Sequence, residues 1–181
     1  TLDITCFYFS LSQFNYYSIQ FENYNHLNAM FLNLKSIHVL VVEDIAPMRE
    51  LISEMLSAMG IGTVSVACDG REGLSMYRGL KPDIIITDWE MPDMNGLELI
   101  KHVRRDPKSP KRHIPIIMLT GFSSKDRISQ ARNDGVTEFM VKPFSAEDLA
   151  KRIQYVIRNP RDFIVVPNFV GPDRRRKEDE S

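Results

Sequence analysis

Asp-Ile-Ile-Ile-Thr-Asp occupies residues 83–88, and this stretch decides the fold. Three isoleucines in a row predict a strand buried on both faces, because a strand with one exposed face would alternate apolar and polar side chains. The sequence predicts four more short strands, at residues 37–42, 63–67, 114–119 and 138–141. Amphipathic stretches separate these strands, which indicates a parallel sheet covered by helices on both faces.

The amphipathic stretches predict five helices, at residues 46–59, 71–78, 97–105, 124–133 and 145–158. The first of these helices has an apolar stripe that consists of Met48, Leu51, Ile52, Met55 and Leu56. Five units of strand and helix are enough for one doubly wound α/β domain with the flavodoxin-like strand order 2-1-3-4-5. Ligands of such domains bind at the carboxyl ends of the strands, so we expect the site there.

The composition fits one folded domain with additional segments. Of the 181 residues, 43% are hydrophobic and 26% are charged, which is enough for a substantial core. We expect the domain at residues 37–158, between an N-terminal extension (1–36) and a C-terminal tail (159–181). The extension is rich in aromatic residues and Asn and has no helical or strand period. Because the chain begins at Thr1, we expect the native start at Met30, and an aromatic docking arm is the alternative.

The C-terminal tail is too short for a DNA-binding or catalytic output domain, so none is expected. An apolar run at residues 163–166 predicts a short extended piece. A basic cluster at residues 174–177 is followed by acidic residues at 178–180. We expect a solvated tail with cancelling charges, and a tail that contacts a partner or RNA is the alternative.

Charge and hydropathy exclude several classes of partner. The formal net charge is −1, so no overall field attracts the chain to nucleic acid or to an anionic membrane. No apolar run reaches the roughly 18 residues of a membrane helix, and the first basic residue is Lys35, unlike a signal peptide. The two cysteines, Cys6 and Cys68, form neither a metal-binding pair nor a disulfide framework. We therefore expect a cytoplasmic protein that binds neither DNA nor membrane.

Polar side chains follow four of the predicted strands. Glu43 and Asp44 follow the first strand, Asp88 the third, Thr120 the fourth and Lys142 the fifth. Taken singly, each has an ordinary alternative role, such as a helix cap or a solvated surface lysine. Together they should converge on one edge of the sheet, where carboxylates about 4 Å apart repel by roughly 4 kcal/mol at an effective dielectric near 20. A divalent cation relieves this repulsion, and an all-oxygen site suits Mg²⁺.

Residues 37 to about 158 resemble the response-regulator receiver family, the CheY-like fold. The resemblance rests on the Glu43-Asp44 pair and on the stretches at residues 84–92, 118–121 and 141–144. It implies a stand-alone response regulator of two-component signalling. Such a protein is not an enzyme in the usual sense, because it catalyses only its own phosphorylation and a slow loss of the phosphoryl group.

The resemblance also implies roles for the site residues. Asp88 is similar to the phosphoacceptor, Asp44 to the main metal carboxylate and Glu43 to the second acid. The family's metal also takes the backbone carbonyl two residues past the acceptor, which here belongs to Glu90. These residues would hold Mg²⁺ beside Asp88.

Three further positions match the family's switch machinery. Thr120 resembles the hydroxyl that moves to bond the phosphoryl oxygens, and Lys142 resembles the ammonium that pairs with them. Phe139 takes the position of the switch aromatic residue. The family also implies a cis peptide bond between Lys142 and Pro143, which is accessible to X-Pro bonds.

Two positions that border the site depart from the small polar residues often found there. They are Glu90 and Phe122. We expect the anionic Glu90 to repel water and the bulky Phe122 to block it, so that hydrolysis of the acyl phosphate is slow.

The expected donor is a histidine kinase or a histidine phosphotransfer protein, docked over the apolar residues 45–48. A downstream protein is expected on the face formed by the fourth predicted helix, the fifth strand and the fifth helix.

Three other classes of protein fit less well. A Rossmann enzyme would need a third glycine after residues 60–62, and an aspartate-nucleophile phosphatase would use Glu90 as its acid but lacks a use for Lys142-Pro143. A receiver-shaped module that works unphosphorylated would not need every one of these residues.

Overall fold

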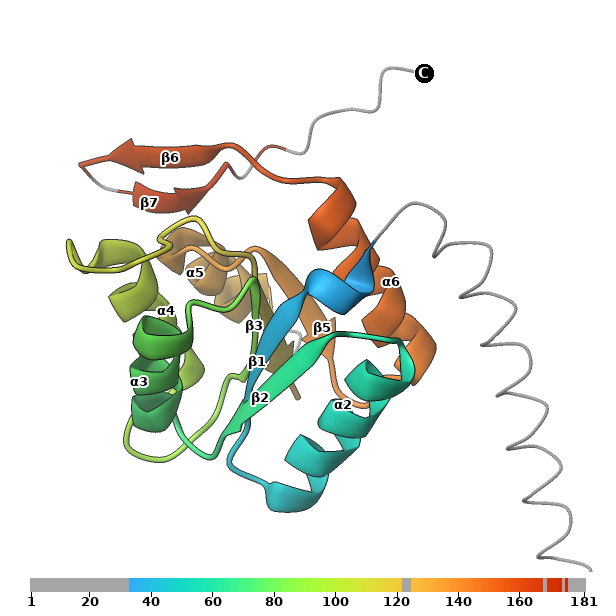
Figure 1. Ribbon diagram of the computed structural model, residues 1–181. Coiled ribbons are helices and arrows are strands. Elements are labelled where there is room, and N and C mark those ends of the chain that lie inside the picture. Colours follow the sequence, from blue (N-terminus) through green and yellow to red (C-terminus); the bar gives the residue numbers. More distant parts are fainter. Residues whose placement is uncertain (1–32, 122–124, 168, 174, 176–181) are drawn as a thin grey trace, which may run out of the picture.

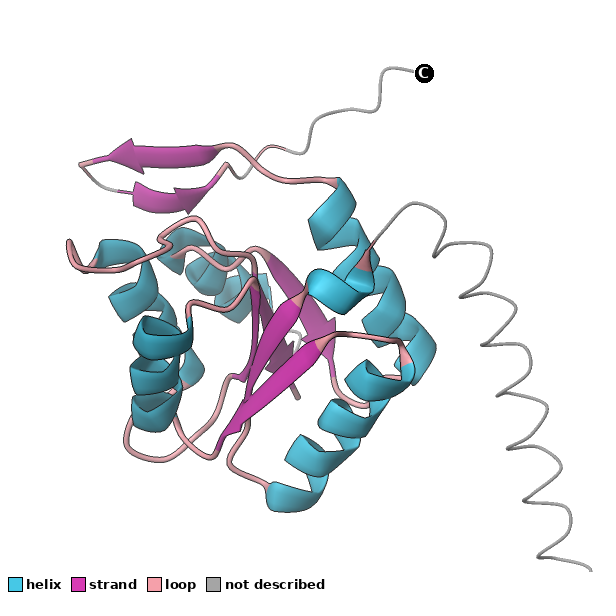
Figure 2. Ribbon diagram, in the orientation of Figure 1, coloured by secondary structure: helices cyan, strands magenta, loops and turns pink. Residues whose placement is uncertain are grey.

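The computed structural model describes residues 33–121, 125–167, 169–173 and 175. The expectations for Met30, Phe122 and most of the extension fall outside these described residues. A five-stranded parallel sheet has the order β2-β1-β3-β4-β5, with helices on both faces (Figures 1 and 2). The strands are β1 (His38–Val42), β2 (Thr63–Ala67), β3 (Ile84–Asp88), β4 (Ile116–Thr120) and β5 (Glu138–Val141). The predicted fold class and strand order are confirmed.

Helices α2 and α6 cover one face of the sheet, and α3, α4 and α5 cover the other (Figure 1). Their bounds are α2 (Ala46–Ala58), α3 (Gly70–Leu80), α4 (Gly96–Arg105), α5 (Lys125–Asp134) and α6 (Ala146–Arg158). A single 3-10 turn, η1 (Leu34–Ser36), precedes β1, and Leu34 packs against the core beneath α2 and α6. Within the described residues, no helix is both long enough and apolar enough to cross a membrane.

The sheet has a hydrophobic core on each face, and the three isoleucines of β3 contribute to both, as expected for a strand that is buried on both faces. Ile85 packs beneath α3, α4 and α5, whereas Ile84 and Ile86 pack beneath α2 and α6. All three are at most 1% exposed. Full burial of a side chain of this size contributes roughly 1.5–3 kcal/mol. This buried centre places the end of β3, and therefore Asp88, in the middle of the sheet's edge.

Side chains cap the first turns of α3, α4 and α6. Asn95 and Glu98 form a capping box at α4, and Ser145 and Asp148 form another at α6. Asp69 accepts a hydrogen bond from the backbone of Glu72 and starts α3 one residue earlier than predicted. These caps satisfy backbone N–H groups that have no partner within the helix.

The apolar stripe predicted for the first helix is wrong at Leu51. This side chain is 45% exposed, whereas Ile52 and Leu56 are fully buried. The stripe that faces the sheet is centred on Ile52 and Leu56, and Leu51 lies about 100° around the helix from Ile52. Its neighbours on the stripe, Met48 and Met55, are half-buried.

The C-terminal segment forms an antiparallel hairpin of β6 (Phe163–Val166) and β7 (Phe169–Pro172). The expectation of a solvated tail is therefore wrong for β7, in which Phe169, Gly171 and Pro172 are buried. Close backbone packing explains the burial, because a Cβ atom on Gly171 would lie 2.8 Å from the Cα of Gly135. Of the basic cluster at residues 174–177, only Arg175 is described, and it is exposed.

The hairpin lies at the end of the molecule where the sheet strands begin (Figure 1). Strand β7 packs against α5 and α4. The fully buried Arg104, at the end of α4, lies 5.7 Å from the ring centroid of Phe163 in β6. The site expected from the sequence lies at the opposite end of the sheet, where the strands finish.

Candidate functional site

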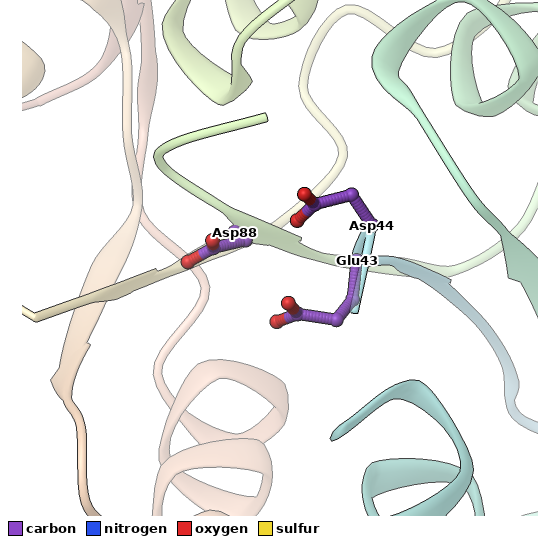
Figure 3. Close-up of side chains that lie close together, drawn as sticks. All are labelled: Glu43, Asp44 and Asp88. Atoms are coloured by element: carbon purple, nitrogen blue, oxygen red, sulfur yellow. The ribbon is translucent and has the colours of Figure 1, made fainter. Parts of the chain in front are cut away.

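Three carboxyl groups meet where β1 and β3 end (Figure 3). Glu43 and Asp44 follow β1 directly, and Asp88 is the last residue of β3. One oxygen of each carboxyl group lies within 4.8 Å of the other two. Glu43 is fully buried and Asp88 is 7% exposed, while Asp44 is half-buried. The sequence therefore brings together three negative groups in a place with little water to screen them.

Lys142 joins two of these carboxylates. Its Nζ atom lies 2.8 Å from Glu43 Oε2 and 2.9 Å from Asp88 Oδ1. Lys142 follows β5, and its backbone N–H donates to the carbonyl oxygen of Thr120 at 2.8 Å. The predicted cis peptide bond between Lys142 and Pro143 is confirmed. Four of the residues expected at one edge of the sheet therefore lie close together: Glu43, Asp44, Asp88 and Lys142.

Burial and charge act against each other in this cluster. Burial raises the pKa of the Glu43 carboxyl; the hydrogen bond from Lys142 lowers it, and repulsion from Asp88 raises it again. The net pKa shift of Glu43 is upward despite its cationic partner. For Lys142, burial lowers the pKa, but the bonds to Glu43 and Asp88 outweigh it, so the net pKa shift is also upward. Lys142 therefore remains a cation at neutral pH.

Two carboxylate oxygens in this cluster have no donor. Among the described residues, Glu43 Oε1 and Asp44 Oδ1 are buried side-chain atoms without a hydrogen-bond partner. Leaving such an atom unsatisfied costs about 1–3 kcal/mol or more. Both oxygens belong to groups that ligate hard cations, so the cluster fits a divalent cation of the Mg²⁺ type. Glu90 lies two residues past Asp88, and its side chain is exposed.

Thr120 and Phe139 lie on one face of the sheet. Thr120 ends β4 and is 1% exposed. The parallel register pairs Thr120 with Val141 and Met118 with Phe139, so these side chains point to the same side. Phe139 is half-buried and packs against the core beneath α3, α4 and α5. The structure thus places both expected switch residues in one layer, while Phe122 lies outside the described residues.

A surface groove follows β5 and α6. Its volume is about 440 Å³, and its lining includes Phe139, Val141, Pro143, Phe144, Lys151 and Tyr155. The groove lies on the face where the sequence predicts a downstream partner. At the start of α2, Ile45 is 54% exposed, and Ala46 and Pro47 are also exposed. The apolar patch expected to receive the donor is therefore accessible.

Sequence reasoning missed Arg49, which enters the site from α2. Its Nη1 atom donates to the carbonyl oxygen of Glu43 at 2.6 Å and to that of Asp44 at 3.3 Å. One signal was present in the sequence, because a basic residue in the first turn of a helix opposes the helix dipole. A favourable local contact must therefore offset the unfavourable interaction with the dipole. Here the contact is the pair of hydrogen bonds from Arg49 to the backbone carbonyls of Glu43 and Asp44.

Comparison with known proteins agrees with this geometry. The family description "Response regulator receiver domain" matches residues 39–154. The chain is 32% identical over 122 residues to chemotaxis protein CheY-3 of Vibrio cholerae, which covers 67% of this chain and 92% of that protein. It is 35% identical over 118 residues to chemotaxis protein CheY of Pseudomonas aeruginosa, covering 65% and 94%.

A solved structure shows the same relationship. The Vibrio cholerae chemotaxis response regulator CheY4 superposes with a TM-score of 0.62 at 37% identity, covering 66% of this chain and 98% of that one. The family match extends over more than half of the chain and ends before the hairpin. The sheet order, the acidic cluster and these matches lead to one conclusion: the chain belongs to the response regulator receiver domain family.

Proposed function

We propose that the chain accepts a phosphoryl group on Asp88 from a phosphohistidine of a histidine kinase or a histidine phosphotransfer protein. The observation that carries this proposal is the placement of Lys142. Its Nζ atom bonds Asp88 and Glu43 at 2.9 and 2.8 Å, beside the two buried carboxylate oxygens that lack a donor. An aspartate held next to a cation and a metal-type cluster suits phosphoryl transfer, in which positioning and charge neutralisation supply most of the catalysis.

The transfer forms a bond between a carboxylate oxygen of Asp88 and phosphorus. The bond between phosphorus and the donor's imidazole nitrogen breaks, and its electron pair stays on that nitrogen, which takes up a proton from solvent. Asp88 becomes an acyl phosphate, and Lys142 pairs with its oxygens. Glu43, Asp44, Asp88 and the carbonyl of Glu90 would hold Mg²⁺, which would supply further charge neutralisation to the transfer.

The new charge changes the conformation of Thr120 and Phe139, which lie on the same face of the sheet. A phosphoryl group adds nearly two negative charges and several acceptors, so the Thr120 hydroxyl moves inward to bond it. Phe139 then rotates toward the space left behind, which changes the groove along β5 and α6. The downstream partner binds this face, formed by α5, β5 and α6, in one of the two states.

The acyl phosphate on Asp88 is expected to hydrolyse slowly. Glu90 lies two residues past Asp88 and is exposed, and from this position we expect its charge to disfavour the attacking water. Phe122 lies outside the described residues, and from its sequence position we expect it to obstruct the approach of that water. The donor docks on the exposed apolar residues at the start of α2, which include Ile45 and Pro47. Both assignments follow the sequence positions and rest on the same phosphorylation of Asp88.

The test is phosphorylation by a small donor. The purified chain is incubated with acetyl phosphate and Mg²⁺, and the product is followed by intact mass and by its lability to hydroxylamine, which cleaves acyl phosphates. We expect one phosphoryl group on the wild-type chain and none on Asp88→Asn. Asp93→Asn is the matched control, since Asp93 is an exposed acid on the adjacent loop with a backbone φ of 61° that Asn also tolerates. Equal labelling of Asp88→Asn and wild type would overturn the proposal.

A further inference from the structure

The start of α2 lacks the usual side-chain cap. Its N-cap residue, Ile45, has no side chain that could accept a hydrogen bond. Instead, Arg49 in the first turn reaches back and donates to the carbonyl oxygens of Glu43 and Asp44. The helix dipole opposes a cation at this end of a helix. The two charge-assisted hydrogen bonds offset this cost, and they attach the helix to the acidic loop.

These bonds hold the backbone from which the metal-type carboxylates extend. On the other side, the N–H of Glu43 donates to the carbonyl of Ala67 in β2 at 3.1 Å. The N–H of Arg49 donates to the carbonyl of Ile45 at 3.0 Å. The acidic loop is thus held between β2 and the guanidinium of Arg49. A rotation of either peptide unit would displace Glu43 Oε1 and Asp44 Oδ1, the two buried oxygens that lack a donor.

We propose that Arg49 is a positioning residue for the divalent cation: it fixes the backbone of Glu43 and Asp44 so that their carboxylates are aligned before the cation binds. The proposal rests on the phosphorylation of Asp88 with Mg²⁺ described above. Arg49 touches neither the phosphoryl group nor the cation in this role. It acts only through the two carbonyl groups.

The direction in which Mg²⁺ affinity changes when Arg49 is removed distinguishes a positioning role from an effect of its charge. A nearby guanidinium repels Mg²⁺, so if Arg49 acted by its charge alone, its removal would tighten Mg²⁺ binding. If Arg49 acts by positioning, its removal weakens Mg²⁺ binding. Loss of a residue that orients metal ligands weakens metal affinity by about 10–100-fold. Added salt reduces the first effect and leaves the second largely unchanged, because the Debye length falls to about 3 Å at 1 M.

Mg²⁺ affinity can be read from Trp89. This is the only tryptophan of the chain, it follows Asp88 directly, and it is 6% exposed. Fluorescence titrations with MgCl₂ alone would compare wild type, Arg49→Ala, Arg49→Lys and a matched control, Arg71→Ala. Arg71 is an exposed cation in the first turn of α3. We expect the Kd for Mg²⁺ to rise about tenfold or more in Arg49→Ala, less in Arg49→Lys, and not at all in Arg71→Ala.

Two measurements without metal complete the test. Thermal unfolding shows that each variant is folded at the titration temperature, and Arg49→Lys replaces Arg49→Ala if the alanine variant is not. Amide hydrogen exchange of Asp44 and Ile45 should be faster in the Arg49 variant than in wild type. An unchanged or lower Kd in a folded Arg49 variant would refute the positioning role while the proposed function stands. A wild-type chain that shows no Mg²⁺ binding by fluorescence or calorimetry would instead contradict the proposed function itself.

Discussion

Under the proposed function, a proton and the divalent cation compete for Glu43. Burial raises the pKa of this carboxyl above its ordinary value of 4.5, and Lys142 offsets the rise only in part. A raised pKa in the folded state means that the protonated form is favoured by folding. This contribution to stability is fully present below the ordinary pKa and is lost as the pH rises through the folded pKa. At neutral pH, the folded protein therefore holds a carboxylate that gains from a cation.

We predict that Mg²⁺ affinity falls at acid pH with a midpoint above 4.5 for the Glu43 contribution. Below this midpoint, the Kd should rise by up to about tenfold per pH unit, because one proton must leave for each cation bound. Trp89 fluorescence titrations from neutral to acid pH would measure it. Glu43→Gln removes the titrating group, so its Kd should be higher at pH 7 and change less over the same range. A Glu43→Gln profile parallel to wild type would show that other carboxylates carry the whole pH dependence.

At the scale of the elements, one buried arginine joins α4 to the loops before β4 and β5 and to the hairpin. Arg104 donates from Nε to the carbonyl of Gly135 at 2.9 Å, and its other nitrogens donate to Arg112 and Thr137. Burial lowers the pKa of Arg104 to about 9. This value is still above neutral, so the cation persists and faces the ring of Phe163. Arg104 therefore contacts the hairpin through the ring of Phe163, while its three hydrogen-bond acceptors lie in the loops that precede β4 and β5.

We predict that Arg104→Met lowers the free energy of unfolding by about 2–4 kcal/mol. Methionine fills the space and removes the cost of a buried charge, but it leaves the buried carbonyl of Gly135 without the Arg104 donor, at about 1–3 kcal/mol, and the half-buried hydroxyl of Thr137 with one donor fewer. Urea unfolding measures the change, and limited proteolysis near residues 159–162 reports release of the hairpin. Arg105→Met is the matched control, since Arg105 is exposed and its pair with Asp134 is 3.4 Å long. An equal loss in both variants would mean that burial of Arg104 is not the cause.

Local patterns predicted the sheet but not the hairpin, for a physical reason. The isoleucines of β3 and the polar residues at strand ends carry their signal in neighbouring positions, so strand order and a shared edge followed from them. Phe169 and Gly171 carry no such pattern, because Gly171 packs against Gly135, far away in the chain. The bonds of Arg49 to two carbonyls also depend on the loop's folded path.

On the scale of the whole molecule, β5 runs from the end of the sheet near the hairpin to the end that carries the acidic cluster. At its beginning, the buried Glu138 pairs with Arg152 of α6 at 2.8 Å and with Arg161, which precedes the hairpin. After its last residue comes Lys142, which bonds Asp88 in the acidic cluster. The hairpin lies at the opposite end of the sheet from the cluster (Figure 1). Whether the two ends are coupled can be measured.

We predict that Phe169→Ala lowers the free energy of unfolding by about 3 kcal/mol, as expected for a large aromatic side chain that is 8% exposed. The Kd for Mg²⁺ should stay within about twofold of wild type, because the packed sheet between the two ends is intact in the folded variant. Val165→Ala, at a site 61% exposed, should change stability by less than about 0.5 kcal/mol. Urea unfolding and the Trp89 titration give both values on one sample. A tenfold change in Kd with Phe169→Ala would mean that the hairpin acts on the acidic cluster through β5, and that it regulates the site in addition to stabilising the domain.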